Sequence, residues 1–151
     1  MKKYIKSYFA KFPEIKVYMD ETIKFCRKSG YVKNIFGRKS HFLNINDKNY
    51  NVRNFQERAA INAPIQGSAS EIMRLAMIRL DKRLKEQKNK KTKMLLQIHD
   101  ELIFETSKDE VKRISKIIIE EMSSVVKSEH HSFSIPLTVD LNIGDNWGEL
   151  H

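Results

Sequence analysis

Apolar residues in the first part of the chain recur every three or four positions, which is the period of a helix buried on one side. Pro13 interrupts this pattern, so residues 3–28 are expected to form two helices, the second beginning just after that proline. Gly30 suits a left-handed cap at the end of the second helix. Residues 31–45 look extended and turn near Gly37, which predicts a small hairpin.

The longest helical pattern covers residues 54–88. Asn54 is followed three positions later by Glu57, a spacing typical of a capping box at the start of a helix. Pro64 lies inside this run, where we expect it either to kink the helix or to mark a later start.

Two short apolar runs, 94–98 and 102–105, follow in the second half of the chain. Only ionisable residues separate them, which predicts two strands joined in a tight hairpin. Ser107 and Glu110 then have the spacing of another capping box, ahead of a further helical stretch.

Apolar residues alternate strictly with other residues over 135–143, which predicts a strand after a loop at 128–134. These elements together predict an α+β fold, in which long helices pack with a small antiparallel sheet. We divide the chain into residues 1–53, with the first helices and hairpin, and residues 54–151. The second part holds the long helix, the second hairpin, a covering helix and the last strand.

The charge of the chain is unevenly distributed. The 151 residues include 28 Lys and Arg and 19 Asp and Glu, a net charge of +9, which fits one globular domain or a piece of a larger one. Residues 1–93 hold 23 basic and 8 acidic residues, whereas residues 94–151 hold 5 and 11. The basic part suggests a polyanionic partner, although solubility alone would also explain it.

Two further features of the composition exclude whole classes of site and partner. The single cysteine excludes an internal disulfide and a zinc site built from cysteines. No apolar run approaches the roughly 20 residues of a transmembrane helix, so we expect no membrane partner.

His99, Asp100 and Glu101 lie at the tip of the second expected hairpin. Asp has a structural role in turns, because its side chain can bond nearby backbone groups. The functional alternative is that the adjacent carboxylates bind Mg²⁺, which prefers oxygen ligands and can serve phosphoryl transfer as a pair of ions. Two carboxylates rarely suffice for two ions, so another acidic residue from elsewhere is expected. For His99 we favour hydrogen bonding over metal ligation.

Arg58, Asn62 and Gln66 stand at positions i, i+4 and i+8 and share one face of a continuous helix. We call these three residues the polar stripe. They could donate hydrogen bonds to the acceptors that every base pair presents in the minor groove, or form a solvated face opposite the core. Small residues beside the stripe would let another helix or a nucleic-acid backbone approach closely. They are Ala59, Ala60, Ala63, Gly67 and Ala69.

Two other groups of residues give weaker indications. Lys33, Arg38 and Lys39 on the first hairpin could contact phosphate or belong to a solvated turn. Tyr8, Phe9 and Phe12 are expected in the core rather than on a platform for stacking bases.

Several motifs resemble the family A DNA polymerases, of the bacterial DNA polymerase I type. Residues 97–101, Gln-Ile-His-Asp-Glu, with the following Leu-Ile-Phe-Glu are similar to motif C of that family, and residues 58–69 are similar to its long palm helix. Tyr8-Phe9 with Phe12-Pro13, Gly30-Tyr31-Val32 with Gly37-Arg38, and the closing Gly144-Asp-Asn-Trp147 also fit. The resemblance covers essentially the whole chain, in order.

The resemblance implies an enzyme of DNA replication and repair that adds deoxynucleotides to a primer 3′-hydroxyl under template direction, using two Mg²⁺ ions. It implies that Asp100 is a metal ligand, that Glu101 sits beside the metal site and that His99 helps to place the primer end. The polar stripe would contact the duplex near the newest base pair. Primer-template DNA and deoxynucleoside triphosphates are the implied partners. The bacterial cytoplasm is the implied location, with an organelle as the alternative.

Two parts of the family pattern have no match in this chain. These are motif A, which carries the other catalytic carboxylate, and the helix that grips the nucleotide. We therefore expect this chain to contain the end of the fingers and part of the palm, as a fragment or a split-gene product. Such a chain is expected not to polymerise alone. A sheet edge is expected to be exposed where the motif A strand would pair. The alternatives are a non-catalytic basic module that binds duplex DNA, and a subunit completed by a separate chain that carries the N-terminal part.

Overall fold

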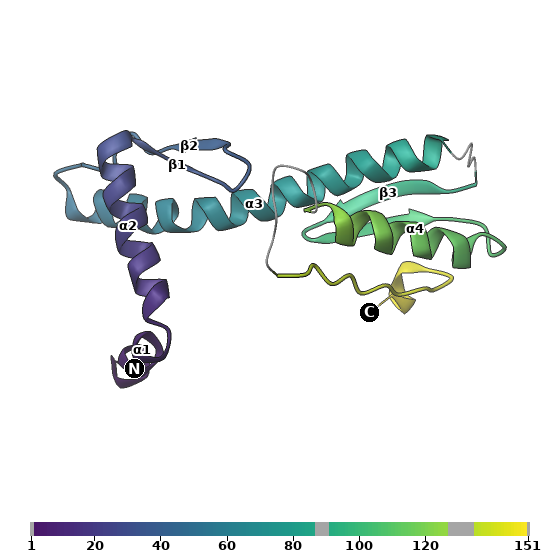
Figure 1. Cartoon of the computed structure of the whole chain (residues 1–151), viewed down its shortest axis with the longest axis horizontal. Coiled ribbons are helices and arrows are strands. Elements are labelled where there is room, and N and C mark those ends of the chain that lie inside the picture. Colours follow the sequence, from purple (N-terminus) through teal and green to yellow (C-terminus); the bar gives the residue numbers. More distant parts are fainter. Residues whose placement is uncertain (1, 87–90, 127–134, 151) are drawn as a thin grey trace. The chain divides into compact units, whose positions relative to one another are not determined.

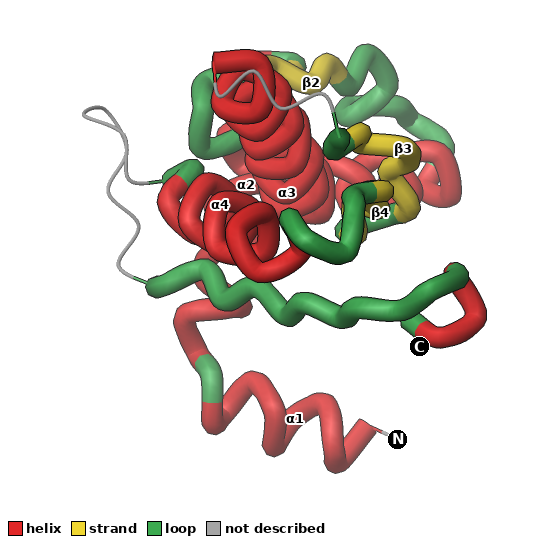
Figure 2. Tube along the Cα trace, turned by 90° about the vertical axis from the view of Figure 1, so that its right-hand side faces the viewer, coloured by secondary structure: helices red, strands yellow, loops and turns green. Residues whose placement is uncertain are grey.

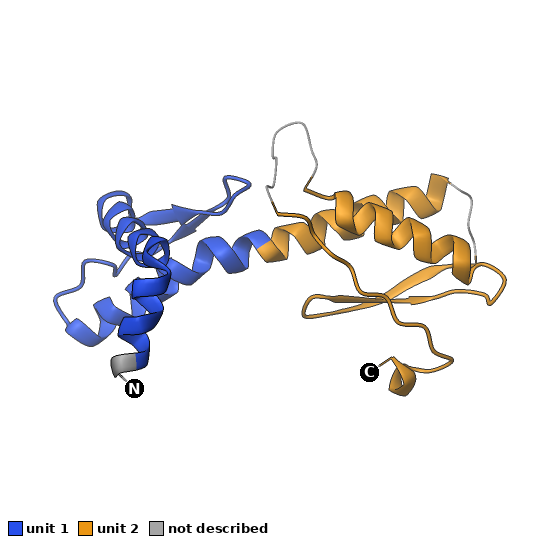
Figure 3. Ribbon diagram, turned by 60° about the horizontal axis from the view of Figure 1, so that its bottom comes forward, with its two compact units in different colours: residues 1–68 blue, residues 69–151 orange. Residues whose placement is uncertain are grey.

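The computed structural model of the chain describes residues 2–86, 91–126 and 135–150. The chain forms two compact units, residues 1–68 and residues 69–151, which are coloured separately in Figure 3. Their boundary falls inside the long helix α3 (Tyr50–Glu86), so each unit contains a part of that helix. The division at residue 54, which follows the sequence motifs, stays a prediction.

Unit 1 begins with the two helices expected on either side of the Pro13 break, α1 (Lys2–Lys11) and α2 (Pro13–Ser29). Pro13 is the first residue of α2, where a missing N–H costs nothing because that group has no helical partner. Gly30 ends α2 with φ of +77°, and its N–H donates to the Cys26 carbonyl at 2.7 Å. The predicted left-handed cap is therefore confirmed.

Of the three aromatic residues expected in the core near the end of α1, only Phe9 is partly buried. Tyr8 and Phe12 are 51% and 41% exposed, so the expectation that they are buried was wrong. Their rings pack on each other instead, with centroids 5.3 Å apart. Phe12 lies between the two helices, and the spacing of Tyr8 in α1 cannot show whether another element covers its side chain.

The first predicted hairpin is confirmed by β1 (Tyr31–Lys33) and β2 (Lys39–His41), which pair antiparallel with Val32 opposite Ser40. Gly37 lies in the turn with φ of +81°, a left-handed conformation that favours glycine. In unit 1, Figure 1 shows α2 crossing the first part of α3, with this hairpin lying along α3.

The core of unit 1 joins α2, β1, the loop after β2 and α3 through four buried residues. They are Cys26, Val32, Ile45 and Ala60. Burial raises the pKa of the Cys26 thiol, because the apolar surroundings disfavour the thiolate. Ala60 is fully buried, so at this position the small side chain serves close packing within the protein.

The long helix α3 runs without a break through Pro64, so that proline does not mark a later start. The capping box predicted at Asn54 was wrong, because α3 begins four residues earlier, at Tyr50. Asn49 caps it instead, since its side-chain oxygen accepts the N–H of Asn51 at 2.9 Å. The Glu57 carboxylate bonds Arg27 of α2 rather than the start of its own helix.

Unit 2 contains the second predicted hairpin, which is confirmed. Strands β3 (Lys93–Ile98) and β4 (Glu101–Glu105) form a two-stranded antiparallel sheet, with Ile98 opposite Glu101. Helix α4 (Val111–Ser124) and the second part of α3 pack together and against this sheet, and Figure 2 shows the two helices side by side. The buried residues of this core are Leu80, Leu84, Ile114, Ile117 and Ile118. Four helices and two small antiparallel sheets among the described residues confirm the α+β class.

Two other expectations in unit 2 were wrong. Glu110 stands at the start of α4 but makes no side-chain cap hydrogen bond, so the second capping box does not form. Residues 135–143 belong to no ladder, although Figure 2 shows them drawn out along unit 2. Leu137 and Leu141 pack on the core, whereas Ile135 and Ile143 are 71% and 63% exposed.

The alternation over 135–143 therefore reports burial on one side, but a strand also needs a neighbouring backbone to bond. The chain ends its described part in a short 3₁₀ turn, η1 (Trp147–Glu149). The loop expected at 128–134 lies outside the described residues. Over the ranges that the structure covers, no helix is both long enough and apolar enough to cross a bilayer.

Candidate nucleic-acid interface and carboxylate pair

The polar stripe lies on the part of α3 that belongs to unit 1. Arg58, Asn62 and Gln66 are all exposed, and the unbroken helix keeps them on one side, each about 40° around the axis from the last. Ala60, about 200° around the axis from Asn62, is the position that packs in the core. The stripe is thus the outer face of a helix whose inner face is fixed by packing.

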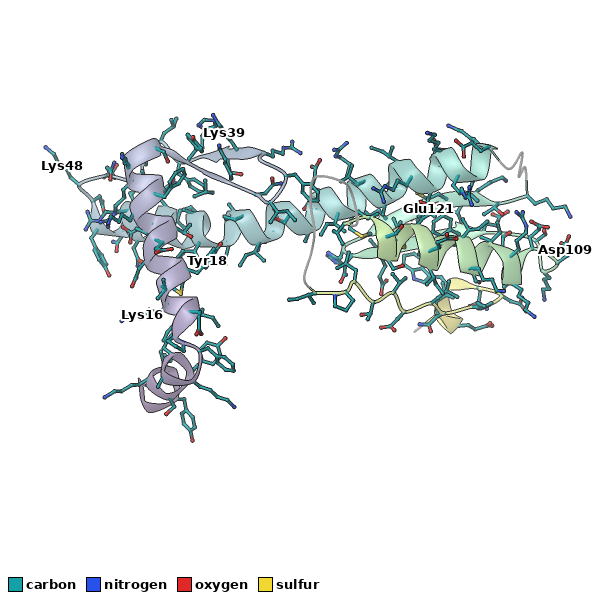
Figure 4. The ribbon with its side chains drawn as sticks, in the orientation of Figure 1. Lys16, Tyr18, Lys39, Lys48, Asp109 and Glu121 are labelled. Carbon is teal, nitrogen blue, oxygen red and sulfur yellow. The ribbon has the colours of Figure 1, made fainter. Side chains whose placement is uncertain are left out.

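Two side-chain bonds from α2 hold this segment of α3 in place. The Tyr18 hydroxyl donates to the Ile61 carbonyl at 3.0 Å, and Arg27 forms an ion pair with Glu57. Glu57 and Ile61 are one helical turn apart and flank Arg58. Figure 4 labels Tyr18 on α2, next to α3. The helix that carries the stripe is therefore tied to its own unit at two successive turns.

Asn34 is a residue of this region that the sequence-based reasoning missed. It is 8% exposed and lies at the start of the loop that carries Arg38. Its side chain bonds the backbone of that loop and the backbone of α3 at Gly67. An Asn three residues before a turn Gly is a recognised turn pattern, and that spacing could have pointed to it.

The outer face of the first hairpin combines lysines with aromatic rings. Tyr31 pairs with His41 and Lys33 pairs with Lys39, so all four share one face. The Lys39 Nζ lies 4.5 Å from the centroid of the Tyr31 ring, a cation–π arrangement. Figure 4 labels Lys39 on this hairpin. The lysines of this face could therefore contact phosphate, or they could simply be solvated.

The basic character of the chain belongs to the unit that carries the stripe. Residues 1–68 hold 14 Lys and Arg against 5 Asp and Glu, a net charge of +9. Residues 69–151 hold 14 of each sign and are neutral overall. The whole net charge of the protein therefore lies in unit 1, where it favours a polyanionic partner.

The three residues of the second hairpin tip lie in unit 2 and are all exposed. His99 and Asp100 form the two-residue loop, and Glu101 begins β4. His99 has φ of +51°, a left-handed conformation that costs a non-glycine residue about 1 kcal/mol. The Gln97 side chain donates to the His99 carbonyl at 3.2 Å and supports this turn. Strain of this kind often accompanies a functional constraint, whereas a purely structural turn favours Asn or Gly.

The donors at this tip suit Mg²⁺ in kind but not in number. Asp100 and Glu101 offer exposed carboxylate oxygens, the donors that Mg²⁺ prefers. Over the described ranges, no three His, Cys, Asp or Glu residues are grouped so that they could hold a metal ion.

Comparison with known proteins adds independent information. A family model described as DNA polymerase family A matches residues 1–149. DNA polymerase I of Streptococcus pneumoniae serotype 4 is 45% identical over 148 residues, which cover 98% of this chain and 16% of that protein. DNA polymerase I of Geobacillus stearothermophilus is 41% identical over 145 residues, which cover 96% and 16%.

A solved structure has the same fold. The POL domain of Pol1 from M. smegmatis, in complex with DNA primer-template and dNTP, matches with a TM-score of 0.91 and 34% identity over 99% of this chain and 25% of that chain. The chain spans about one sixth of the length of the curated relatives it matches. It belongs to DNA polymerase family A and corresponds to a C-terminal portion of the bacterial DNA polymerase I type.

Proposed function

We propose that this chain supplies the duplex-binding helix and one side of the metal site of a template-directed DNA polymerase. The observation that carries the proposal is the exposed polar stripe on α3, in the unit that holds the entire net charge of +9. Arg58, Asn62 and Gln66 donate hydrogen bonds to minor-groove acceptors, which are present in every base pair and thus allow binding without sequence preference. The relative from M. smegmatis was solved with primer-template and dNTP, which supports these two partners.

The hairpin tip has the second role in this proposal. Asp100 would ligate Mg²⁺, Glu101 would lie beside the ion, and His99 would help to position the primer end. Two Mg²⁺ ions would supply activation of the attacking 3′-oxygen and stabilisation of the leaving phosphate oxygen. The relatives named above are bacterial, which supports replication or repair in the bacterial cytoplasm as the setting.

The isolated chain is proposed to bind duplex DNA without extending a primer. The reason is the incomplete donor set, because the described residues provide no group of three metal ligands. Binding needs only the stripe and the positive charge, whereas phosphoryl transfer needs the full metal site. The two activities should therefore separate in this chain.

A primer-extension experiment in two stages tests the proposal. First, the full 151-residue chain is mixed with a labelled primed template, Mg²⁺ and the four deoxynucleoside triphosphates. We expect salt-dependent binding and no extension. Second, the chain is combined with a polypeptide that carries the remaining polymerase region of a relative, and extension is expected to appear.

The second stage identifies the metal ligand. Asp100→Ala should abolish the restored extension, whereas Asp140→Ala, a matched change at another exposed carboxylate of unit 2, should not. Extension by the pure wild-type chain would contradict the proposed separation. If the restored extension persisted after Asp100→Ala, the proposal that Asp100 ligates Mg²⁺ would be contradicted. If no substitution in the polar stripe changed DNA affinity, the proposed role of the stripe as the DNA interface would be contradicted.

The second candidate is a non-catalytic module that binds duplex DNA. The concentration of charge in unit 1 favours it, because the stripe and the charge do not require the hairpin tip. It predicts normal binding and no restored extension with any polymerase partner.

A further inference from the structure

Asn34 uses both the oxygen and the nitrogen of its side-chain amide in hydrogen bonds within unit 1. Its Oδ1 accepts the backbone N–H groups of Phe36 at 3.0 Å and of Arg38 at 2.9 Å. Its Nδ2 donates to the Gly67 carbonyl of α3 at 3.1 Å. Two N–H donors on one side and a carbonyl on the other match the acceptor and donor of an amide in this orientation.

The backbone of Asn34 closes the same loop. Its N–H donates to the Arg38 carbonyl at 3.0 Å, and its carbonyl accepts the N–H of Gly37 at 3.0 Å. Gly37 supplies the left-handed turn that allows this closure. Arg38 is therefore bonded to Asn34 through both its N–H and its carbonyl, so its backbone has little freedom.

The loop is also attached to α3 at a second point. The Ile35 N–H donates to the Ser68 hydroxyl at 3.2 Å, and that hydroxyl donates to the Pro64 carbonyl at 2.5 Å. Asn34 and Gly67 are neighbours, since a Cβ built on Gly67 would be in ordinary van der Waals contact with the Asn34 Cβ, at 3.6 Å. Both attachments fall beside Gln66, at the end of the polar stripe.

We propose that Asn34 is a positioning residue for duplex binding, which holds Arg38 at a fixed place relative to the polar stripe. It connects the loop that carries Arg38, the proposed phosphate contact, to the helix that carries the proposed minor-groove donors. Because the two groups are ordered before DNA arrives, binding does not have to pay the entropy of ordering the loop. This inference rests on the proposed DNA-binding function and adds a residue that does not itself touch DNA.

A role in stability alone predicts something different. If Asn34 only stabilised the loop, its loss would weaken binding independently of Arg38, and the effects of the two changes would multiply. If Asn34 acts through Arg38, the loss of DNA affinity in the double variant should be about the same as in either single variant. A double-mutant cycle on DNA affinity separates these two cases.

The experiment uses the full chain and a fluorescent primed DNA duplex, titrated at several salt concentrations. Arg38→Ala should weaken binding several-fold and lower the salt slope by about 1. Asn34→Ala should weaken binding several-fold as well. In the Asn34→Ala background, the further change Arg38→Ala should alter neither affinity nor slope appreciably.

Two variants keep the result interpretable. Asn34→Asp retains the acceptor for the loop N–H groups but loses the donor to Gly67, so binding should fall while the amides of Phe36 and Arg38 stay protected from hydrogen exchange. Asn46→Ala removes another amide that bonds backbone in unit 1, the Arg27 carbonyl at 2.9 Å, and should leave DNA affinity unchanged.

The outcomes distinguish the inference from the function on which it rests. Absence of duplex binding by the wild-type chain would overturn the proposed function and the inference with it. Wild-type binding with multiplying effects of Asn34→Ala and Arg38→Ala would overturn the inference alone. Equal affinity of the wild type and Asn34→Asp would show that the bond to Gly67 has no positioning role.

Discussion

The hydroxyl of Tyr18 donates a hydrogen bond of 3.0 Å to the backbone carbonyl of Ile61, which joins α2 to the turn of α3 that precedes Pro64. A proline inside a helix cannot donate to the carbonyl four residues earlier and loosens the helix at that turn. The Tyr18 bond is a support from outside α3 at this weak point, next to the polar stripe.

Removing that hydroxyl should therefore destabilise unit 1. We expect Tyr18→Phe to lower the free energy of unfolding by about 1 kcal/mol, the usual net contribution of one such bond. Urea denaturation followed by circular dichroism measures it. Tyr4→Phe is the matched control, because Tyr4 is 82% exposed, and it should change nothing measurable. Equal midpoints for the two variants would refute a stabilising role for the Tyr18 bond.

The glycines at 30 and 67 should respond to alanine in opposite directions. A Cβ at Gly67 meets only Asn34, at an ordinary contact distance of 3.6 Å, so Gly67→Ala should stabilise α3 by about 0.5–1 kcal/mol. Gly30 has φ of +77°, so Gly30→Ala should destabilise by about 1–2 kcal/mol, although nothing lies within 4 Å of its added Cβ. Thermal and urea unfolding of both variants show whether each substitution raises or lowers the free energy of unfolding.

The ion pair between Lys91 and Asp109 predicts a pH dependence of stability. Lys91 donates to Asp109 at 2.7 Å, the largest of several hydrogen bonds that lower the pKa of this carboxyl from an ordinary 3.8 to about 2. Because the folded pKa is below the unfolded one, the contribution is complete above about pH 4 and is lost as the pH falls towards 2.

Asp109→Asn should therefore lose less unfolding free energy between about pH 4 and pH 2 than the wild type loses. Urea denaturation at a series of pH values measures this slope, with Asp140→Asn as the control at an exposed carboxylate. A slope identical in all three proteins would contradict the assignment.

The second sheet should promote self-association of the isolated chain. Within the described residues it has only the strands β3 and β4, so each has an outer edge without a partner strand. Leu95 of β3 is also half-exposed, at a bulge in the pairing. Unpaired edges with apolar side chains favour pairing between copies. Sedimentation velocity should show association that grows with concentration and that Leu95→Lys reduces. A monodisperse monomer at high concentration would count against this.

Local rules explain why many elements could be predicted from the sequence. Pro13 and Gly30 mark the limits of α2 because they restrict or free the backbone of their own residue. The second hairpin follows equally from two apolar runs around a short polar link. The motif around Asp100 and the stripe on α3 led to the family that the comparisons confirm.

The errors occurred where a pattern depended on a partner distant in sequence. Residues 135–143 alternate as a strand does, but whether they bond a neighbouring backbone depends on what lies beside them. Tyr8 lies in α1 and Phe12 directly after it, but no local pattern shows whether another element covers their side chains. Asn54 and Glu57 have capping spacing, yet Glu57 bonds Arg27, which lies 30 positions earlier.

The sequence by itself determined the family, the α+β class, the carboxylates at the hairpin tip and the spacing of the stripe, because each depends on residue type and short-range periodicity. Only the tertiary structure decided that the whole net charge lies in unit 1 and that Ala60 packs inward. It alone joined Asn34 to Gly67, 33 residues away. Hydrogen bonds and burial between distant segments arise from the folded packing, which no local pattern encodes.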